Sequence, residues 1–293
     1  MGYGKVIKTP AYFSRKRLPF ARRLSCKTNY KKRHIIVRQN LKKPNFQQTR
    51  LVVRVSNKRV ICQMVKAYPK GDVTLACADS SELRAYNIKF GLKNFSACYL
   101  TGLLLGSRVM RQSKLKSIYR GNKEKIGVSF LEANIAGQPA TYRAILDMGL
   151  KKPTLGSKIF AALKGVCDAG VYVPHKSKLF FGYDKKEKKL NSEKLRSKIL
   201  GEDLAKYAIK ARENNEGTSL FSQYPQKETI YPALIQQAIN IIHKNPKKIP
   251  GSAKIGKVNK RTGTKVAKMK KKSYEQRKAD IEIQKQAWLE QMA

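Results

Sequence analysis

The sequence predicts an α/β protein with a mixed sheet, an extended basic arm at its N-terminus and a mostly helical C-terminal extension. Three strand-like runs lie close together between residues 51 and 79, and strand-like and helix-like segments alternate after them, which is typical of an α/β body. The third observation is the charge. The 293 residues carry a formal net charge of +44, and the basic residues gather in long segments that contain no acid.

A three-strand meander opens the predicted body. Alternating apolar residues over 51–55, an apolar run over 60–65 and a further run over 73–79 are separated by short polar turns, which favours three strands joined in order. Arg54 falls on the face opposite Leu51, because successive side chains of a strand point to opposite faces. We therefore expect at least part of that face to be wet or to bind a charged group.

Helix-like segments follow the meander. The segment 94–110 is apolar almost all round up to Leu105, so we expect a helix that is covered on most sides, with Asn94 as its N-cap. Gly102 and Gly106 permit a close approach of a neighbouring element. We further expect a strand over 142–147 and helices over 156–169, 192–212, 228–243 and 273–293.

The composition divides the chain into five parts. Residues 1–71 hold 20 Lys and Arg and no acid, and residues 244–272 hold 12 and again no acid. The predicted parts are a basic N-terminal arm (1–49), an α/β body (50–185), a helical extension (186–243), a basic linker (244–272) and a C-terminal helix (273–293).

The charge also limits the class of protein. A compact chain at +44 repels itself, so it needs a polyanion as its normal environment, and nucleic acid fits this requirement best. An anionic membrane surface is an alternative, although the arm is not strongly amphipathic. The longest charge-free stretch, 229–243, is too short to span a membrane, and the N-terminus lacks the apolar run of a signal peptide. We expect a soluble intracellular protein.

Aromatic and basic residues are interleaved in the arm. Lys and Arg meet phosphates, while aromatic rings stack on unpaired bases, so this mixture indicates contact with RNA. A solvated basic tail or a nuclear-import signal is the simpler interpretation. Thr28 is a candidate N-cap for a short helix reaching about Arg38. The interleaved aromatic residues are Tyr3, Tyr12, Phe13, Phe20, Tyr30 and Phe46.

No pattern of catalytic, cofactor or metal-binding residues stands out. The five cysteines include no C-x-x-C pair and the three histidines do not cluster with them, so we expect reduced thiols and no cofactor or metal. A metal-dependent RNA-processing nuclease is the alternative function, because such sites need several converging carboxylates. Asp79, Asp147 and Asp168 are its candidate ligands.

Several segments together resemble one family. They are G-Y-G-K-V-I-K-x-x-A-Y-F, T-N-Y-K-K-R, L-V-V-R-V-S-N-K-R-V-I-C-Q, G-L-K-N-F-S-A-C-Y-L-T-G-L-L-L and L-G-S-K-I-F-A-A-L-K-G-V-C-D-A-G-V-Y-V-P-H-K-S, in this order. They are similar to the eukaryotic members of the universal L-eighteen family, large-subunit ribosomal proteins that bind 5S rRNA. The resemblance covers about residues 2 to 185, with departures at Asn29, Leu155 and Ala169.

The resemblance implies a fold, partners and a place. It implies an α/β domain whose arm and one sheet face hold 5S rRNA at the central protuberance of the large subunit. Implied partners are also large-subunit rRNA, assembly factors and the other 5S-associated ribosomal protein (universal L-five, eukaryotic L-eleven), with a nuclear and nucleolar assembly stage before cytoplasmic ribosomes. The implied RNA-binding residues are Lys5, Tyr12, Arg15, Arg17, Arg22, Arg23, Lys27, Tyr30, Arg33, Arg54, Asn57 and Lys158.

Overall fold

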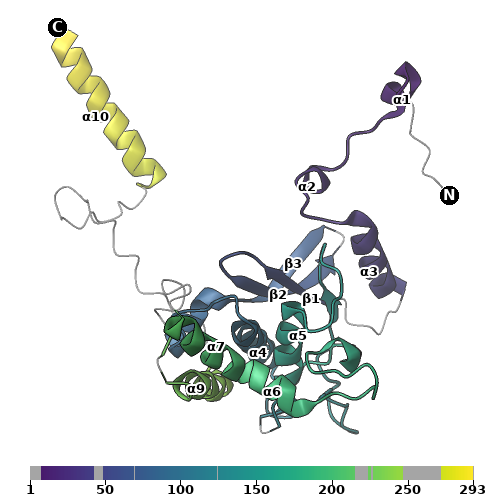
Figure 1. Ribbon diagram of the computed structural model, residues 1–293. Coiled ribbons are helices and arrows are strands. Elements are labelled where there is room, and N and C mark those ends of the chain that lie inside the picture. Colours follow the sequence, from purple (N-terminus) through teal and green to yellow (C-terminus); the bar gives the residue numbers. More distant parts are fainter. Residues whose placement is uncertain are drawn as a thin grey trace. The chain divides into compact units, whose positions relative to one another are not determined.

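The computed structural model has two compact units, Met1–Lys248 and Ile249–Ala293. The first contains the helices of the arm, a four-stranded sheet and the helices that cover it (Figure 1), and the second contains one helix. The described residues are 8–42, 49–68, 70–123, 125–214, 224–225, 227–246 and 272–292. The arm helices are α1 (Pro10–Arg15), α2 (Ala21–Leu24) and α3 (Tyr30–Lys42), and the short 3-10 helices are η1 (Ser80–Tyr86) and η2 (Ser177–Leu179).

The sheet is mixed, with strand order β3-β2-β1-β4. Strands β1 (Thr49–Val55), β2 (Val60–Tyr68) and β3 (Gly71–Asp79) form the antiparallel meander, and β4 (Ile145–Asp147) pairs with β1 in parallel. The predicted fold class and the three-strand meander are confirmed.

Strand β4 is shorter than the predicted strand over 142–147. Only Ile145–Asp147 pairs with β1. Upstream of it, Arg143 forms an isolated bridge with Tyr172, so the backbone changes its partner before β4 begins. The apolar run alone gives no sign of this change.

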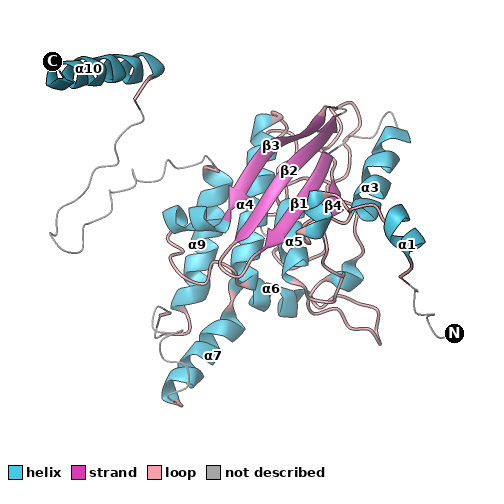
Figure 2. Ribbon diagram, turned by 90° about the horizontal axis from the view of Figure 1, so that it is seen from above, coloured by secondary structure: helices cyan, strands magenta, loops and turns pink. Residues whose placement is uncertain are grey.

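Helices α4 (Phe95–Gln112) and α5 (Lys158–Asp168) lie behind the strands, on one face of the sheet (Figure 2). Both are almost entirely buried, which confirms the prediction that α4 is covered on most sides. The two helices cross very closely, because a Cβ on Gly102 would overlap the backbone carbonyl of Ala162 and one on Gly165 would overlap that of Tyr99. Glycine at these positions therefore sets the distance between α4 and α5.

A second group of helices packs against α4. The predicted helix over 192–212 is in fact two helices, α6 (Ser192–Leu200) and α7 (Glu202–Glu213). Gly201 separates them with a φ of +78°, a left-handed conformation that ends α6. Helix α9 (Ile230–Lys244) fulfils the prediction for 228–243 and buries Ile235 and Ile239.

The N-cap of α4 differs from the sequence prediction. Asn94 occupies the cap position, but its side chain makes no capping hydrogen bond to the helix. It donates instead to the hydroxyl of Tyr224, at an Nδ2–Oη distance of 2.6 Å. The residue that marks the start of the helix thus links it to a distant part of the chain.

Helix α10 (Tyr274–Met292) belongs to the second unit. It begins with the predicted capping box, in which Gln276 donates its backbone N–H to Ser273 Oγ at 3.2 Å and accepts from the Ser273 N–H at 3.0 Å. Trp288 and Ile281 are more than half exposed. In the described part of the chain, no helix combines the length and the apolar character needed to cross a membrane.

Candidate nucleic-acid interface

The first two helices of the arm have no core of their own. Thr9 caps α1 by accepting a hydrogen bond from the Tyr12 N–H at 3.3 Å, and Pro10 follows in the first turn. Neither α1 nor α2 buries a side chain. Helices this short are marginal in water without packing, so this part of the arm needs a partner surface to hold its shape.

Asn29 caps helix α3, which corrects the prediction for Thr28. The backbone N–H of Lys32 donates to Asn29 Oδ1 at 3.1 Å. The Thr28 hydroxyl instead accepts from Nε of Arg22 at 3.0 Å, which ties α2 to the start of α3. The helix also runs past Arg38, to Lys42. Asn29 is one of the departures from the usual family pattern, and asparagine is among the best capping residues.

Aromatic rings in the arm pack on one another in pairs. Tyr12 meets Phe13 edge-on at a centroid distance of 5.4 Å, and Tyr30 meets Phe20 at 4.9 Å. The two tyrosines are half-buried, whereas Phe13 and Phe20 are 55% and 71% exposed. The phenylalanines therefore offer more free ring surface to a nucleic-acid base than the tyrosines named from the family resemblance. The equal aromatic character of the four residues hides this difference in the sequence.

Three arginines and two aspartates form a network on the sheet face opposite α4 and α5. Arg33 of α3 binds Asp72 through two hydrogen bonds of 2.6 and 2.9 Å. The buried Arg50 pairs with Asp72 and, at 2.9 Å, with Asp147. Arg54 reaches Asp147 Oδ1 at 3.3 Å. We call these five residues the arginine–aspartate network; it links α3, β1, β3 and β4.

The hydrogen bonds and charges within the network shift the pKa values of Asp72 and Arg33. The hydrogen bond from Arg33 is the main cause that lowers the pKa of Asp72 below its ordinary value, and Arg50 adds to it. The same hydrogen bond raises the pKa of Arg33. Both groups therefore remain charged across the physiological range. The network still carries one excess positive charge, because three guanidiniums face two carboxylates.

A second contact holds α3 on the body. Nζ of Lys32 donates to the carbonyl oxygen of Gly149, beyond the end of β4, at 3.3 Å. Lys32 and Arg33 are neighbours in α3. Lys32 binds just beyond the end of β4, and Arg33 binds Asp72 near the start of β3. Helix α3 is thus anchored on the body, and the arm residues between α1 and α3 lead directly into this anchored helix.

Among the described residues, the structure brings only two of the predicted RNA-binding residues together. Arg33 and Arg54 come together through the network, and Asn57 is exposed in the turn that follows β1. Lys158 is exposed at the start of α5, in a pocket that also contains Lys198, and it is not part of the network. Lys5 lies outside the described residues. The remaining arm cations are all exposed: Arg15, Arg17, Arg22, Arg23 and Lys27.

Sequence reasoning missed Arg50 and Asp72, which are central to this surface. Arg50 is 3% exposed, so it acts through its carboxylate partners rather than by reaching solvent. The position of Asp72 was a usable signal, because it is the first acid after 71 residues without one. A lone carboxylate in such surroundings is expected to attract arginines.

The three carboxylates considered for a nuclease have separate structural roles. Asp79 caps η1 by accepting from the Ser81 N–H at 2.8 Å. Asp147 belongs to the network, and Asp168 is fully buried beside Lys164, with Tyr99 donating to it at 2.8 Å. Among the described residues, no group of three or more acidic, histidine or cysteine side chains is placed to hold a metal ion.

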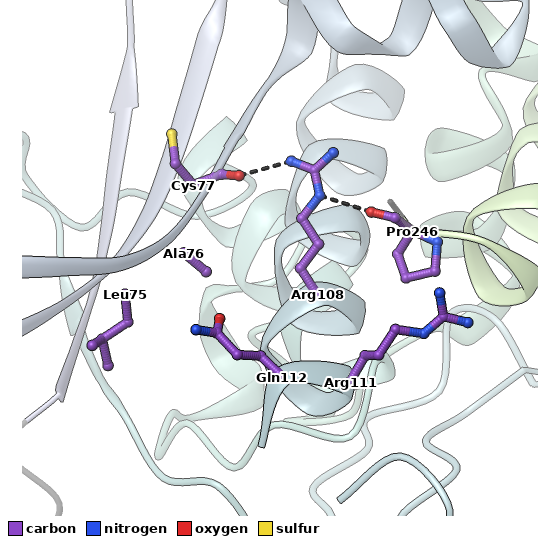
Figure 3. Close-up of a pocket in the computed structure, with 7 residues that line it drawn as sticks. All are labelled: Leu75, Ala76, Cys77, Arg108, Arg111, Gln112 and Pro246. Atoms are coloured by element: carbon purple, nitrogen blue, oxygen red, sulfur yellow. Dashed lines mark hydrogen bonds between the residues drawn. The ribbon is translucent and has the colours of Figure 1, made fainter. Parts of the chain in front are cut away.

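An apolar groove beside strand β3 is organised by Arg108 (Figure 3). This guanidinium donates to the carbonyl oxygens of Cys77 and Pro246 at 2.7 and 2.8 Å, and to Glu82 at 2.6 Å. It thereby satisfies a carbonyl at the sheet edge and joins it to the end of α9. Burial is the main cause that raises the pKa of the Cys77 thiol, which disfavours its reactive thiolate form.

Comparisons with known proteins match most of this chain. The family model described as "Ribosomal large subunit proteins 60S L5, and 50S L18" matches residues 14–176. Curated relatives named "Large ribosomal subunit protein uL18" come from Dictyostelium discoideum (40% identical over 240 residues, 79% of this chain and 82% of the relative), Dunaliella salina (40% over 245 residues, 83% and 89%) and Caenorhabditis elegans (42% over 216 residues, 74% and 73%). The family match runs from within α1 to beyond α5, so it includes most of the arm and the whole sheet.

Proposed function

The chain belongs to this family of large-subunit ribosomal proteins, and from that premise we propose that it binds 5S rRNA and delivers it to the central protuberance during subunit assembly. The family membership itself makes the chain a structural component of the large ribosomal subunit. It is not an enzyme, and the nuclease alternative is wrong.

The exposed, acid-free arm is the observation that carries the proposal. Its guanidinium and ammonium groups match a phosphate backbone, and its exposed phenylalanine rings match unpaired bases. Neither α1 nor α2 buries a side chain in the protein, so a partner surface is needed to supply most of the free energy that orders them.

The arginine–aspartate network supports the arm from the sheet. Arg33 is a positioning residue in this proposal, because its guanidinium is already bound by Asp72. Arg54 has more freedom, since 43% of its side chain is exposed while its guanidinium contacts Asp147. Asn57 is exposed in the turn that follows the same strand. We propose that Arg54 and Asn57 extend the RNA-binding surface from the arm onto the body, and that Lys158 makes a separate phosphate contact.

The remaining parts of the proposal follow from the family. We propose that the chain joins the other 5S-associated ribosomal protein before incorporation, with a nuclear assembly stage that precedes its place in cytoplasmic ribosomes. We also propose that the five parts of the chain act as an arm, a body, a helical extension, a linker and a terminal helix, with the arm as the main determinant of 5S rRNA affinity.

Charge removal in the full chain tests the proposal. We expect the variant R15A/R17A/R22A/R23A to lose 5S rRNA affinity by about 100-fold or more, since each arginine meets a phosphate or a base. The matched control K185A/K186A/K189A/K206A removes four exposed charges elsewhere and should bind within a few-fold of the parent. Equal losses in the two variants, or equal affinity of the parent for a size-matched unrelated RNA, would contradict a specific arm interface.

A further inference from the structure

A second group of cations gathers away from the arm, where three helices end. Arg111, in the last turn of α4, donates to the carbonyl oxygen of Lys244 at the end of α9, at 3.3 Å. Lys116 follows α4, and its Nζ lies 3.4 Å from the carbonyl oxygen of Ala169 at the end of α5. The C-terminal ends of α4, α5 and α9 are thus joined through basic side chains, and Arg111 also lines the groove of Figure 3.

Three described residues of the loop that follows Lys116 are held by close contacts and hydrogen bonds. Gly121 has a φ of +70°, and any Cβ there would overlap the carbonyl of Asp168. Asn122 donates its backbone N–H to that same carbonyl at 2.9 Å. Its side chain also exchanges two hydrogen bonds, of 2.7 and 3.0 Å, with the backbone of Lys125. The backbone at Gly121 and Asn122 is therefore fixed against the end of α5, and Asn122 also holds the backbone of Lys125.

This loop presents its cations around a pocket. Arg120, Lys123 and Lys125 line a hollow of about 420 Å³, and all three side chains are exposed. Val128 and Phe130 form part of the wall. A phosphate group with its sugar fits a pocket of this size, and the fixed backbone means that little order must be gained on binding.

Two titratable groups close to Lys123 have lowered pKa values. Burial, followed by the neighbouring Lys123 and Arg111, lowers the pKa of Lys116 to about 8, and Glu132 is the carboxylate that opposes this effect. Burial together with Lys116 and Lys123 lowers the pKa of His243 to about 4. Both ring nitrogens of His243 are buried without a hydrogen-bond partner among the described residues.

Structural roles explain only part of this cluster. Helix C-termini carry partial negative charge and unpaired carbonyls, which accounts for Arg111 and Lys116. They do not account for Lys123, which lines the pocket and repels both Lys116 and His243. Lys123 is exposed at the pocket, where an anion can pair with it.

We propose that the pocket formed by Arg120, Lys123 and Lys125, with Lys116 and His243 beside it, binds a phosphate group of RNA independently of the arm. The proposal rests on the proposed function only in taking RNA as the source of the phosphate. The bound anion pairs with Lys123 and allows the neighbouring histidine to take up a proton.

The three histidines of the chain provide separate reporters for a test. His34 is exposed on arm helix α3, and His175 Nδ1 lies 2.7 Å from the carbonyl oxygen of Val173. His243 is close enough to Lys123 of the pocket for that charge to lower its pKa. NMR of the full chain with labelled imidazole rings, at pH 5.5, reports the protonation of each. The probes are 5S rRNA and, separately, pyrophosphate.

The expected result is specific to one ring. In the free protein at pH 5.5 the His243 ring is neutral. On adding RNA, its titration midpoint should rise by about 1.5 units or more, so that at least half of the molecules carry a charged His243. The titration of His175 should not change. Lys123→Met should abolish the RNA-induced change, and Lys185→Met should preserve it. If RNA changes the imidazole signals of His34 but leaves the titration of His243 unchanged, the inference is overturned. If the His34 signals do not change, the result contradicts RNA binding by the arm. A response to pyrophosphate but not to RNA would overturn RNA as the source.

Discussion

Arg33 of helix α3 binds Asp72 of strand β3 through two parallel hydrogen bonds, Nη1–Oδ2 of 2.6 Å and Nη2–Oδ1 of 2.9 Å. Arg33 belongs to the acid-free arm, and Asp72 is the first acidic residue in the chain. The pair therefore joins the arm to the body. Because Asp72 also pairs with Arg50, docking of the arm is coupled to a buried charge in the sheet.

Removing the Asp72 carboxylate should loosen α3. In Asp72→Asn we expect amide hydrogen exchange in α3 to rise, because the bidentate pair is lost, with a cost of about 1 kcal/mol for this partly exposed contact. Arg33→Lys should have a similar effect, since an ammonium cannot make both bonds. Asp203→Asn, at an exposed position of α7, serves as control. Unaltered exchange in α3 of both network variants would show that other contacts hold the helix.

The same pair predicts a dependence on pH. The folded-state pKa of Asp72 is lowered from its ordinary value of 3.8, so its contribution to stability is complete above that value and is lost as the pH falls through the folded-state pKa. Docking of α3 should therefore be constant between about pH 5 and 7 and weaken below about pH 4. Amide hydrogen exchange in α3 measured down the acid range checks this, and Asp72→Asn should lack the transition. A transition of equal size in that variant would assign it to another carboxylate.

Periodicity alone predicted the meander and the buried helices, because alternation over 51–55 and the apolar run of α4 are local signals. The sequence does not predict that the helix ends at Gly201, since a single glycine inside a helical pattern is often tolerated. Asn94 was read correctly as a helix boundary, yet its hydrogen bond goes to Tyr224, 130 residues away. Such long-range contacts have no signature in a single sequence.

The candidate interface shows the same division. Composition was enough to find the arm, but it could not tell which cations are engaged within the protein. In the sequence Arg33 and Arg54 look no different from Arg17 and Arg23 of the arm. In the structure Arg33 and Arg54 bind aspartates, whereas Arg22 donates to the Thr28 hydroxyl. The sequence does not single out Lys123, because one lysine among many basic residues gives no signal until its neighbours in space are known.

The buried pair of Lys164 and Asp168 should make a large contribution to stability. Both side chains are almost fully buried in α5, and Tyr99 donates to the same carboxylate. Asp168→Asn leaves the lysine charge without its counter-ion, so we expect a loss of about 3–5 kcal/mol in chemical denaturation. Lys164→Met added to Asp168→Asn should recover more than half of it. A loss below about 1 kcal/mol in the single variant, the range of an exposed pair, would contradict this.

The salt dependence of RNA binding distinguishes phosphate contacts from positioning residues. Each phosphate contact adds about 0.7–0.9 to the slope of log affinity against log salt concentration, because bound cations release counterions. The variant R22A/R23A removes two exposed guanidiniums, so its slope for 5S rRNA should fall by about 1.4–1.8 relative to the parent. Asp72→Asn removes no cation and should lower affinity, through the loosened arm, without reducing the slope. Filter binding between about 50 and 200 mM salt measures both quantities. If R22A/R23A weakens binding at an unchanged slope, these arginines do not meet phosphates, and the electrostatic part of the proposed interface lies elsewhere in the chain.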